Sequence, residues 1–394
     1  MKIKKPGLLL QIAAAIVTGI VAGMFFPDFC IRTLNTFREI FGQFIRFIVP
    51  MIVIGLVTPA IADTGKSAGR MLLLTMALAV GSTVLSGYMT YFASGTILSS
   101  WISGGFSGGM VAGREFPAYF TLKIPPMVDV VTSLVFSFMV GLGIVAMKAE
   151  RIAGVFSEFR GIVTVTIEKA FVPLLPLYIL SVIADLTACG KLKSVAEPCV
   201  KVMITCVIVT VSLLVLQYVI AGIVARRNPF KALWNMMPAY LTGWGCCSSA
   251  ATIPVTLRQT LANGVSKETA ELVIPLCSSV HLAGSMSNMV SYAIGVIFLY
   301  GGTPDLGAFT EYIMMLTVIA VASPGVPGGV VLASASIVES ALGFTPERYA
   351  LMVAMYMALD GMGTACNLTG DGALAMIVDR FRKGEISEES QVAI

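Results

Sequence analysis

The sequence predicts an all-α membrane protein that crosses the lipid bilayer several times. Of its 394 residues, 57% are hydrophobic and only 12% are charged, whereas a soluble domain carries about 25% charged residues. The apolar residues form long blocks, unlike the alternating residues of outer-membrane β-strands. The net charge of +4 is too small and too scattered for a nucleic-acid-binding face. These observations exclude a soluble enzyme, a nucleic-acid-binding protein and a disordered protein.

The first half of the chain contains six apolar blocks. Each reaches the roughly 20 residues that a helix needs to cross the hydrocarbon core. The first block follows three lysines and lacks a convincing cleavage site, so we expect an uncleaved helix rather than a signal peptide. The six blocks cover about 6–27, 39–62, 71–98, 128–147, 155–186 and 198–225.

Two later apolar segments are interrupted by glycine, proline and serine. Segment 230–261 contains the run Gly243–Pro254, and segment 306–340 contains the run Ser323–Gly329. Non-helical backbone at membrane depth must be buried in protein or line a wet cavity, because lipid offers it no hydrogen-bond partners. Paired interruptions of this kind are typical of inverted-repeat transporters. We therefore expect two re-entrant helical hairpins at these places.

The remaining apolar segments complete the predicted topology. Two further crossings are expected near 270–300 and 345–378, which gives eight transmembrane helices plus two re-entrant hairpins. This topology puts 15 lysine and arginine residues on the side of the N-terminus and 8 on the other side. The excess satisfies the positive-inside rule. Both termini are therefore predicted to be cytoplasmic, in an inner or plasma membrane.

The last apolar segment carries acidic and amide residues on one helical face. At 100° per residue, four polar residues fall within about 60° of one another: Asp360, Thr364, Asn367 and Asp371. A carboxylate at mid-membrane depth costs several kcal/mol and marks a substrate or ion path. No lysine or arginine occurs between Arg348 and Arg380, so the expected partners are a metal cation and a substrate amino group. An ion pair with a basic residue elsewhere in the chain is the alternative.

The hairpin tips offer groups that bind anions. The N-terminus of a half-helix presents free N–H groups and the positive end of its dipole, which suit a substrate carboxylate. Ser248 and Ser249 offer hydroxyls for the same task, with ordinary helix capping as the alternative. The eight cysteines include no CxxC pair, so most are expected to be small buried hydrophobic residues. Cys246 and Cys247, beside these serines, are the open exception.

Three motifs in the second half are specific enough to compare with known transporters. They are Ser248-Ser-Ala-Ala-Thr-Ile-Pro-Val-Thr256, Gly325-Val-Pro-Gly328, and Asp360 followed by Asn367-Leu-Thr-Gly-Asp371. Together they resemble the two hairpin tips and the final helix of the dicarboxylate/amino acid:cation symporter family, the glutamate transporter homologues. The resemblance covers nearly the whole chain and is strongest from about 228 to 380. It implies a homotrimer in which a transport domain moves across the membrane like an elevator.

The resemblance also implies two domains. The scaffold, which trimerises, would contain residues 1–62 (helices 1 and 2) and 101–195 (helices 4 and 5). The transport domain would contain residues 63–100 (helix 3) and 196–394 (helix 6, the first hairpin, helix 7, the second hairpin, helix 8 and a cytoplasmic tail). Such a protein is a transporter in contact with membrane lipids and not an enzyme. It would use no cofactor beside its coupling ion, which is sodium or, as the alternative, a proton.

Two departures from the family pattern predict a small neutral amino acid as the substrate. Members with acidic substrates place an arginine three residues after the first Asp or in the first hairpin, and these positions are Gly363 and Cys247 here. A second substrate carboxylate would therefore lack a charge partner, whereas Asp360 is kept for the amino group. The chain thus resembles the neutral amino acid members of the serine/threonine type. The implied substrate-binding residues are Ser248, Ser249, Ser285, Val326, Pro327, Gly328, Asp360, Gly363, Thr364 and Asn367.

Other functions stay open at this point. A dicarboxylate or acidic amino acid symporter would need a cation from outside the recognised motifs. A channel favours rings of charges or carbonyls in a symmetric pore, whereas the two acidic residues flank asymmetric hairpins. A structural or sensor protein has no use for two unpaired carboxylates at mid-membrane depth.

The resemblance implies sodium sites as well. Oxygen ligands suit a hard cation such as sodium, by the logic that applies to calcium. One site would use Asn367, Asp371 and a carbonyl near Cys277. A second would lie under the second hairpin, with carbonyls near Ala320, Val321 and Ser323 and with Ser279 opposite. A further site beside Ser82 and Thr83 is weakened or lost, because Ala283 stands where the family has an aspartate.

His281, the one histidine of the chain, replaces an asparagine that binds sodium in the family. The family motif Asn-Met-Asp-Gly-Thr appears here as His281-Leu-Ala-Gly-Ser285. A neutral imidazole is a poor sodium ligand, but a protonated ring could stand in for the cation and pair with Asp371. The alternative is a neutral ring that hydrogen-bonds to one of the nearby serines, Ser278, Ser279 or Ser287.

Overall fold

The computed structural model describes most of the chain. The described residues are 8–65, 70–102, 116–128, 130–166, 169–170, 172–190, 192–322 and 328–392. Every regular element within these ranges is helical, which confirms the all-helical class predicted from composition.

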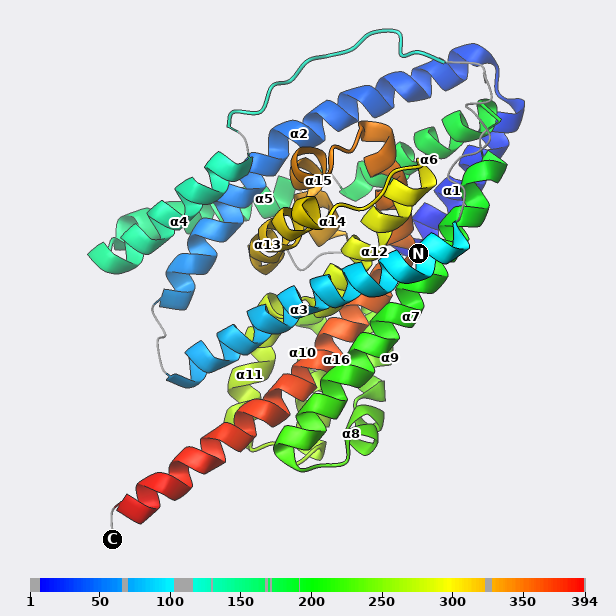
Figure 1. Ribbon diagram of the computed structural model, residues 1–394. Coiled ribbons are helices and arrows are strands. Elements are labelled where there is room, and N and C mark those ends of the chain that lie inside the picture. Colours follow the sequence, from blue (N-terminus) through cyan, green and yellow to red (C-terminus); the bar gives the residue numbers. More distant parts are fainter. Residues whose placement is uncertain are drawn as a thin grey trace, which may run out of the picture.

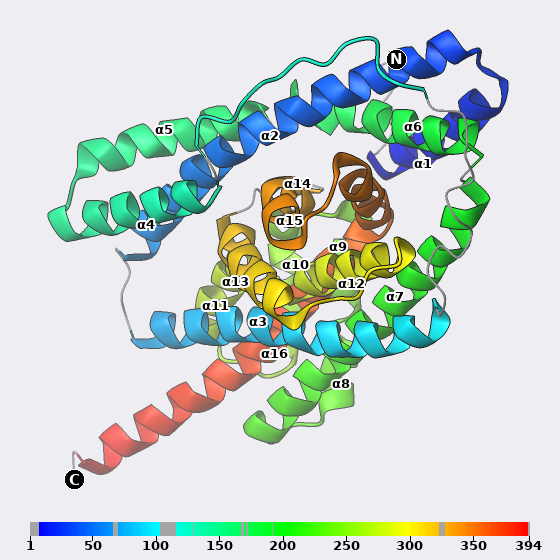
Figure 2. The same cartoon turned by 45° about the horizontal axis from the view of Figure 1, so that its top comes forward.

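One group of helices comes from the N-terminal half and gathers around α2. Helix α2 (Asp28–Gly65) contacts α4 (Val130–Met147), α5 (Glu150–Thr166) and α6 (Val172–Ala188), and α6 packs against α1 (Leu8–Phe25). Figure 2 shows α4 and α5 beside one end of α2, with α1 and α6 beside the other end. These helices form the upper layer of the molecule in that view.

A second group of helices surrounds α12 and α16. Helix α12 (Ala283–Leu299) contacts α16 (Pro346–Val392), and both α3 (Arg70–Trp101) and α7 (Leu192–Ala225) pack against the pair. The residues of α12 are buried along most of its length, because it lies inside this group. Figure 1 shows α16 running from the middle of the molecule to its far end, where the C-terminus lies.

The first interrupted segment folds as helices joined by tight turns. Helix α8 (Pro229–Asn235) is followed by α9 (Met237–Cys246) and α10 (Ser249–Ala262), and α9 and α10 both contact α16. The turn between α9 and α10 falls on Cys247 and Ser248, inside the run that sequence reasoning singled out. This arrangement places the tip of the hairpin against the helix with the acidic residues.

The second interrupted segment is also divided into separate helices, and so is the span predicted near 270–300. Helix α13 (Leu306–Ala322) precedes α14 (Gly329–Ala333) and α15 (Ala335–Leu342), and the tip residues 323–327 lie outside the described residues. The span predicted near 270–300 consists of α11 (Lys267–Val280) and α12, with a break at His281 and Leu282. The break leaves the first N–H groups of α12 without helical partners.

Two predicted segments have different helix bounds in the structure. Within the block 155–186, α5 ends at Thr166 and α6 begins at Val172, and residues 167–168 and 171 lie outside the described residues. The last helix extends beyond the crossing expected near 345–378, since α16 continues to Val392.

The number of crossings stays a prediction. Among the described residues, three helical stretches are long and apolar enough to cross a membrane: Met71–Trp101, Ala196–Ala225 and Lys267–Leu299. The division into a scaffold and a transport domain also stays a prediction.

Candidate functional site

The tip of the first hairpin is a tight turn with two half-buried serines. Cys247 adopts the left-handed conformation (φ 49°, ψ 31°), and its N–H donates to the carbonyl of Gly243 at 2.9 Å. Ser248 is extended and directly precedes α10, but its side chain does not cap the first turn of that helix. The structure therefore contradicts the interpretation of Ser248 as a side-chain helix cap. The first turn of α10 keeps N–H groups that suit an anion.

The polar face predicted for the last segment is buried inside the molecule. Asp360, Thr364, Asn367 and Asp371 lie on α16, and each side chain is less than 10% exposed. Asp360 and Asp371 differ in their partners. No lysine, arginine or histidine of the described chain pairs with Asp360, whereas Asp371 contacts His281. A contact with His281 within the protein thus accounts for one of the two carboxylates.

Asp360 holds the described end of the second hairpin. Its Oδ2 accepts a hydrogen bond of 2.8 Å from the backbone N–H of Gly328, and the hydroxyl of Tyr356 bonds to the same carboxylate. Gly328 has a φ of 75° and lies so close to α16 that an added Cβ would meet the sulfur of Met357 at 2.7 Å. Both donors are neutral, so they stabilise the carboxylate without cancelling its charge. The charge remains available to an ammonium group.

Asn367 caps the broken helix α12. Its Oδ1 accepts from the N–H groups of Gly284 at 2.8 Å and Ser285 at 3.2 Å, and its Nδ2 donates to the hydroxyl of Ser285 at 2.9 Å. The side chain therefore satisfies N–H groups that the break at His281 leaves unpaired. Gly284 permits the close approach, since an added Cβ would lie 2.5 Å from the carbonyl oxygen of Gly363. Asn367, Ser285 and Gly363 therefore lie next to one another.

His281 and Asp371 form a fully buried pair. Nδ1 of His281 lies 2.9 Å from Oδ1 of Asp371, and neither side chain is exposed to solvent. Nε2 of the ring lies 3.1 Å from the hydroxyl of Ser82 and 3.3 Å from Nε2 of Gln217. In the structure, the ring of His281 is therefore paired with the carboxylate of Asp371.

The three serines considered for a neutral His281 are not its partners. The hydroxyl of Ser278 donates to the carbonyl of Pro275, and Ser287 bonds to Thr90 and Thr210. The hydroxyl that contacts the ring comes instead from Ser82, far away in the sequence. The prediction that Ser278, Ser279 or Ser287 bonds to the ring is therefore wrong, because Ser82 of α3 takes that place.

Gln217 on α7 belongs to this cluster and was missed by sequence reasoning. Its Nε2 donates to Ser82 at 3.1 Å, which fixes the serine beside His281. Gly370 lies against both, because an added Cβ would come within 2.7 Å of Gln217 Oε1 and of His281 Cε1. The available signal was a lone amide within the uncharged stretch 202–225, since polar groups in spanning helices tend to be functional.

Two buried oxygens of this cluster are suited to a cation. Oδ2 of Asp371 and Oε1 of Gln217 have no hydrogen-bond partner among the described residues. Hard oxygen donors of this kind suit sodium. Thr83 is used differently from the prediction, since its hydroxyl donates to the carbonyl of Ala79 and accepts from the N–H of Leu282. Ser82 and Thr83 thus support the break and the ring of His281.

The position of Gly363 is closed by Asn288 of α12. A Cβ added at Gly363 would lie 2.7 Å from Nδ2 of Asn288. The amide is held in place, because its Oδ1 accepts from Cys206 at 3.2 Å and from Thr210 at 3.3 Å. Asn288 was also missed by sequence reasoning. It occupies the space that an arginine at position 363 would need.

The remaining predicted residues are only partly described. Ser323, Val326 and Pro327 lie outside the described residues, and the side chain of Val321 does as well. Ala320 is buried on α13, Ser279 is exposed on α11, and the carbonyl of Cys277 accepts from the N–H of His281 at 2.8 Å. The second predicted sodium site therefore stays a prediction.

Comparison with known proteins identifies a family and several relatives that are similar to this chain. The profile described as "Sodium:dicarboxylate symporter family" matches residues 8–381. Excitatory amino acid transporter 2 of Homo sapiens is 30% identical over 165 residues, which cover 42% of this chain and 29% of the relative. Neutral amino acid transporter B(0) of Mus musculus is 29% identical over 162 residues, 40% of this chain and 29% of the relative.

The similarity to these relatives is partial in length. Excitatory amino acid transporter 2 of Mus musculus is 28% identical over 258 residues, which cover 63% of this chain and 44% of the relative. The chain thus spans less than half the length of the curated relatives that it matches.

Proposed function

This chain belongs to the Sodium:dicarboxylate symporter family, a family of transporters and not of enzymes, and from that premise we propose that it is a cation-coupled symporter of a small neutral amino acid. The relatives include proteins named for excitatory and for neutral amino acids at nearly equal identity. The choice between the two substrate classes therefore rests on the site. The observation that carries it is the contact between Gly363 and Asn288.

Among its described residues, the site offers one carboxylate for an amino group and no cation for a second carboxylate. Asp360 is buried and receives only neutral hydrogen bonds, so the ammonium of an amino acid is its natural counter-ion. An acidic side chain of the substrate would need a buried positive partner, because an unpaired buried charge costs several kcal/mol. Asn288 fills the space beside Gly363 with a neutral amide instead. A small polar or apolar side chain fits these surroundings.

We assign the other substrate contacts to the two hairpins and α12. The N–H groups at the start of α10, with Ser248 and Ser249, would bind the α-carboxylate. Thr364, Asn367 and Ser285 would face the side chain of the substrate, and Val326 and Pro327 would cover it from the second hairpin together with Gly328. When substrate enters, its ammonium would bind Asp360 beside the N–H of Gly328, which links occupancy of the site to the position of that hairpin.

The coupling ion is proposed to be sodium, carried as a second substrate. Asp371 and Asn367 would supply oxygens with the carbonyl of Cys277, and Ala320, Val321, Ser323 and Ser279 would form a second site. His281 already occupies Oδ1 of Asp371, so the remaining oxygen there is Oδ2. Ser82 and Thr83 are engaged by the ring of His281 and the N–H of Leu282. We therefore propose that no sodium binds beside Ser82 and Thr83, and a proton remains the alternative coupling ion.

The same proposal includes the oligomeric state, the orientation in the membrane and the motion of the protein. We propose a homotrimer in a cell inner or plasma membrane, with both termini cytoplasmic and with an elevator motion of the transport domain. Crosslinking of the purified protein in lipid would give the subunit number.

Counterflow in proteoliposomes tests the substrate. Vesicles loaded with unlabelled serine, threonine, alanine, aspartate or glutamate are diluted into buffer that contains the labelled amino acid, with sodium or with choline. Uptake of the small neutral amino acids in sodium is expected, and uptake of aspartate and glutamate is not. Tight binding or exchange of aspartate by the unmodified protein would overturn the neutral assignment.

A further inference from the structure

The end of the molecule formed by α7, α8 and α10 carries an open cavity with basic and amide walls. The cavity has a volume of about 490 Å³. Its polar lining consists of Arg227, Asn228, Lys231, Asn235, Asn263 and Gly264, and no acidic residue lines it. Figures 1 and 2 show α8 at the end of α7, away from α2. The cavity lies at the C-terminal end of α10, whereas Ser248 and Ser249 of the amino acid site lie at the start of that helix. This cavity is therefore separate from the transport site.

The charged residues that line this cavity, Arg227 and Lys231, are both basic. From Arg226 to Lys267, both included, the sequence contains five basic residues and no acidic residue. Arg227 is tied to the wall, because its guanidinium donates to the carbonyls of Asn263 and Gly264 and lies 3.8 Å from Asp379. Lys231 is exposed at the cavity and forms no ion pair with any described residue. Its ammonium is the group that lacks a counter-ion.

The walls of the cavity are fixed by hydrogen bonds. Asn228 accepts from the N–H of Lys231 at 3.0 Å and so caps α8, and Asn235 donates to Asn263 at 2.8 Å. Nδ2 of Asn263 donates to the carbonyl of Ala232 at 3.0 Å. The site is therefore shaped before any ligand binds, which lowers the entropy that binding must overcome.

The conformation of Arg226 is a second observation. This residue follows the last residue of α7 and has a φ of 54°, a left-handed conformation that glycine adopts at lower cost. Its side chain is exposed beside Arg227. A further exposed cation thus directly precedes Arg227, which lines the cavity.

The outer face of α8 is aromatic. Phe230 and Trp234 are 66% and 75% exposed, and their spacing places them about 40° apart around the helix. Lys231 and Asn235 lie on the adjoining face, toward the cavity. A short helix with aromatic residues on one side and a cation on the next is typical of the membrane–water interface.

We propose that this cavity binds the phosphate headgroup of an anionic phospholipid, with Lys231 as its charge partner. Phe230 and Trp234 would enter the acyl region of the same leaflet, and Arg226 and Arg227 would add positive potential. Basic pockets beside membrane helices select anionic headgroups in this way. A soluble phosphate shares the charge chemistry, but it would make no use of the two exposed aromatic side chains.

Quenching of Trp234 by brominated lipids tests the proposal. The full chain carries Trp101→Phe and Trp244→Phe, so that Trp234 is the remaining tryptophan, and it is reconstituted in phosphatidylcholine membranes. Phosphatidylglycerol with brominated acyl chains is expected to quench more than brominated phosphatidylcholine at equal content. Lys231→Gln should weaken this preference about five-fold, the value of one basic residue near a membrane surface. Lys231→Arg should retain it.

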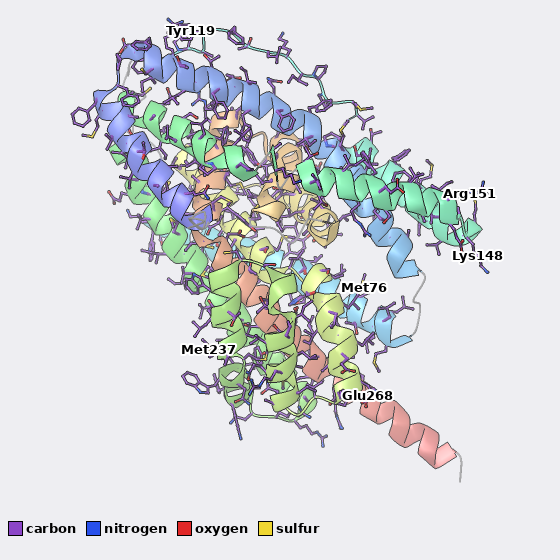
Figure 3. All side chains as sticks on the ribbon, turned by 180° about the vertical axis from the view of Figure 1, so that it is seen from behind. Met76, Tyr119, Lys148, Arg151, Met237 and Glu268 are labelled. Atoms are coloured by element: carbon purple, nitrogen blue, oxygen red, sulfur yellow. The ribbon has the colours of Figure 1, made fainter. Side chains whose placement is uncertain are left out.

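The control removes a positive charge elsewhere. Arg151 is exposed at the α4–α5 turn, and Figure 3 shows it far from Met237, which follows α8. Arg151→Gln should leave the preference unchanged. Equal quenching by the two lipids, or a preference that survives Lys231→Gln, would overturn the site. Loss of the preference in excess inorganic phosphate, with chloride of equal ionic strength as the comparison, would assign the cavity to soluble phosphate and overturn the lipid.

Discussion

The backbone N–H of Gly328 donates a 2.8 Å hydrogen bond to Oδ2 of Asp360. This bond joins the second hairpin to the carboxylate that we assign to the substrate ammonium. Because the donor is neutral, the hairpin and an ammonium group can bind the same carboxylate without competing charges. The relation explains how a bound amino acid would influence the hairpin above it.

Asp360→Asn tests that assignment. The variant keeps the size of the side chain but removes the charge, so the substrate ammonium would be desolvated without a counter-ion, at a cost of roughly 2–5 kcal/mol. We expect substrate affinity to fall at least about 30-fold, while the melting temperature stays close to that of the parent. Isothermal titration and thermal unfolding in detergent measure both. Glu347→Gln, an exposed acid at the start of the same helix, is the matched control, and unchanged affinity in Asp360→Asn would refute the role.

Gly363→Arg should not by itself create an acidic-substrate site. A Cβ at this position would lie 2.7 Å from the held amide of Asn288, and overpacking of this kind costs about 1–3 kcal/mol. We expect the single variant to melt at a lower temperature and to take up no aspartate. The double variant with Asn288→Ala should gain aspartate uptake, because the guanidinium then has space beside the substrate. Asn288→Ala alone is the control, and efficient aspartate uptake by the single variant would show that Asn288 moves aside.

Gly370→Ala should disturb the cluster around His281. Its added methyl would meet Gln217 Oε1 and His281 Cε1, each at 2.7 Å. We expect a loss of about 1–3 kcal/mol of unfolding free energy, measured by thermal or chemical denaturation. Gln217→Ala should recover part of the loss in a double-mutant cycle, since it removes one of the two clashes. Gly143→Ala on α4, where an added Cβ meets nothing within 4 Å, should leave stability equal or higher.

The helical class and the interrupted segments were predictable because their signals are local. Long apolar blocks and Gly-Pro-Ser runs are properties of neighbouring residues, and the turn at Cys247 and Ser248 falls inside the predicted run. The spacing of Asp360, Asn367 and Asp371 likewise follows from helical periodicity, and all three side chains are buried. The helix ends at Thr166 and Val172 were not predicted, because hydropathy alone does not locate the ends of a helix.

The partners across helices were not predictable, because they join residues far apart in the chain. Ser82 and Gln217 reach His281 from α3 and α7, and Asn288 reaches Gly363 from α12. A single polar residue in an apolar helix shows that a partner is needed but not which helix supplies it. Ser278, Ser279 and Ser287 were therefore wrong choices, since the serine beside the ring is Ser82 of α3.

His281→Asn tests how the cation is coupled. The ring of His281 occupies Oδ1 of Asp371 at 2.9 Å in a pair without solvent exposure. Asparagine is shorter and offers an amide oxygen, so it should free Asp371 and add a hard ligand for sodium. We expect the melting temperature of the variant to fall in choline and to rise with sodium more steeply than that of the parent, because bound sodium then replaces the lost contact. Uptake should likewise require more sodium ions per substrate.

The design separates coupling from packing. His281→Leu removes the ring without supplying an oxygen, so it should lose stability in choline and recover none of it in sodium. Melting and uptake are measured against sodium concentration at constant ionic strength in the parent, His281→Asn and His281→Leu. Identical sodium dependence in the parent and His281→Asn would mean that the histidine only packs against Asp371, and the proposed replacement of a cation by the imidazole ring would then be abandoned.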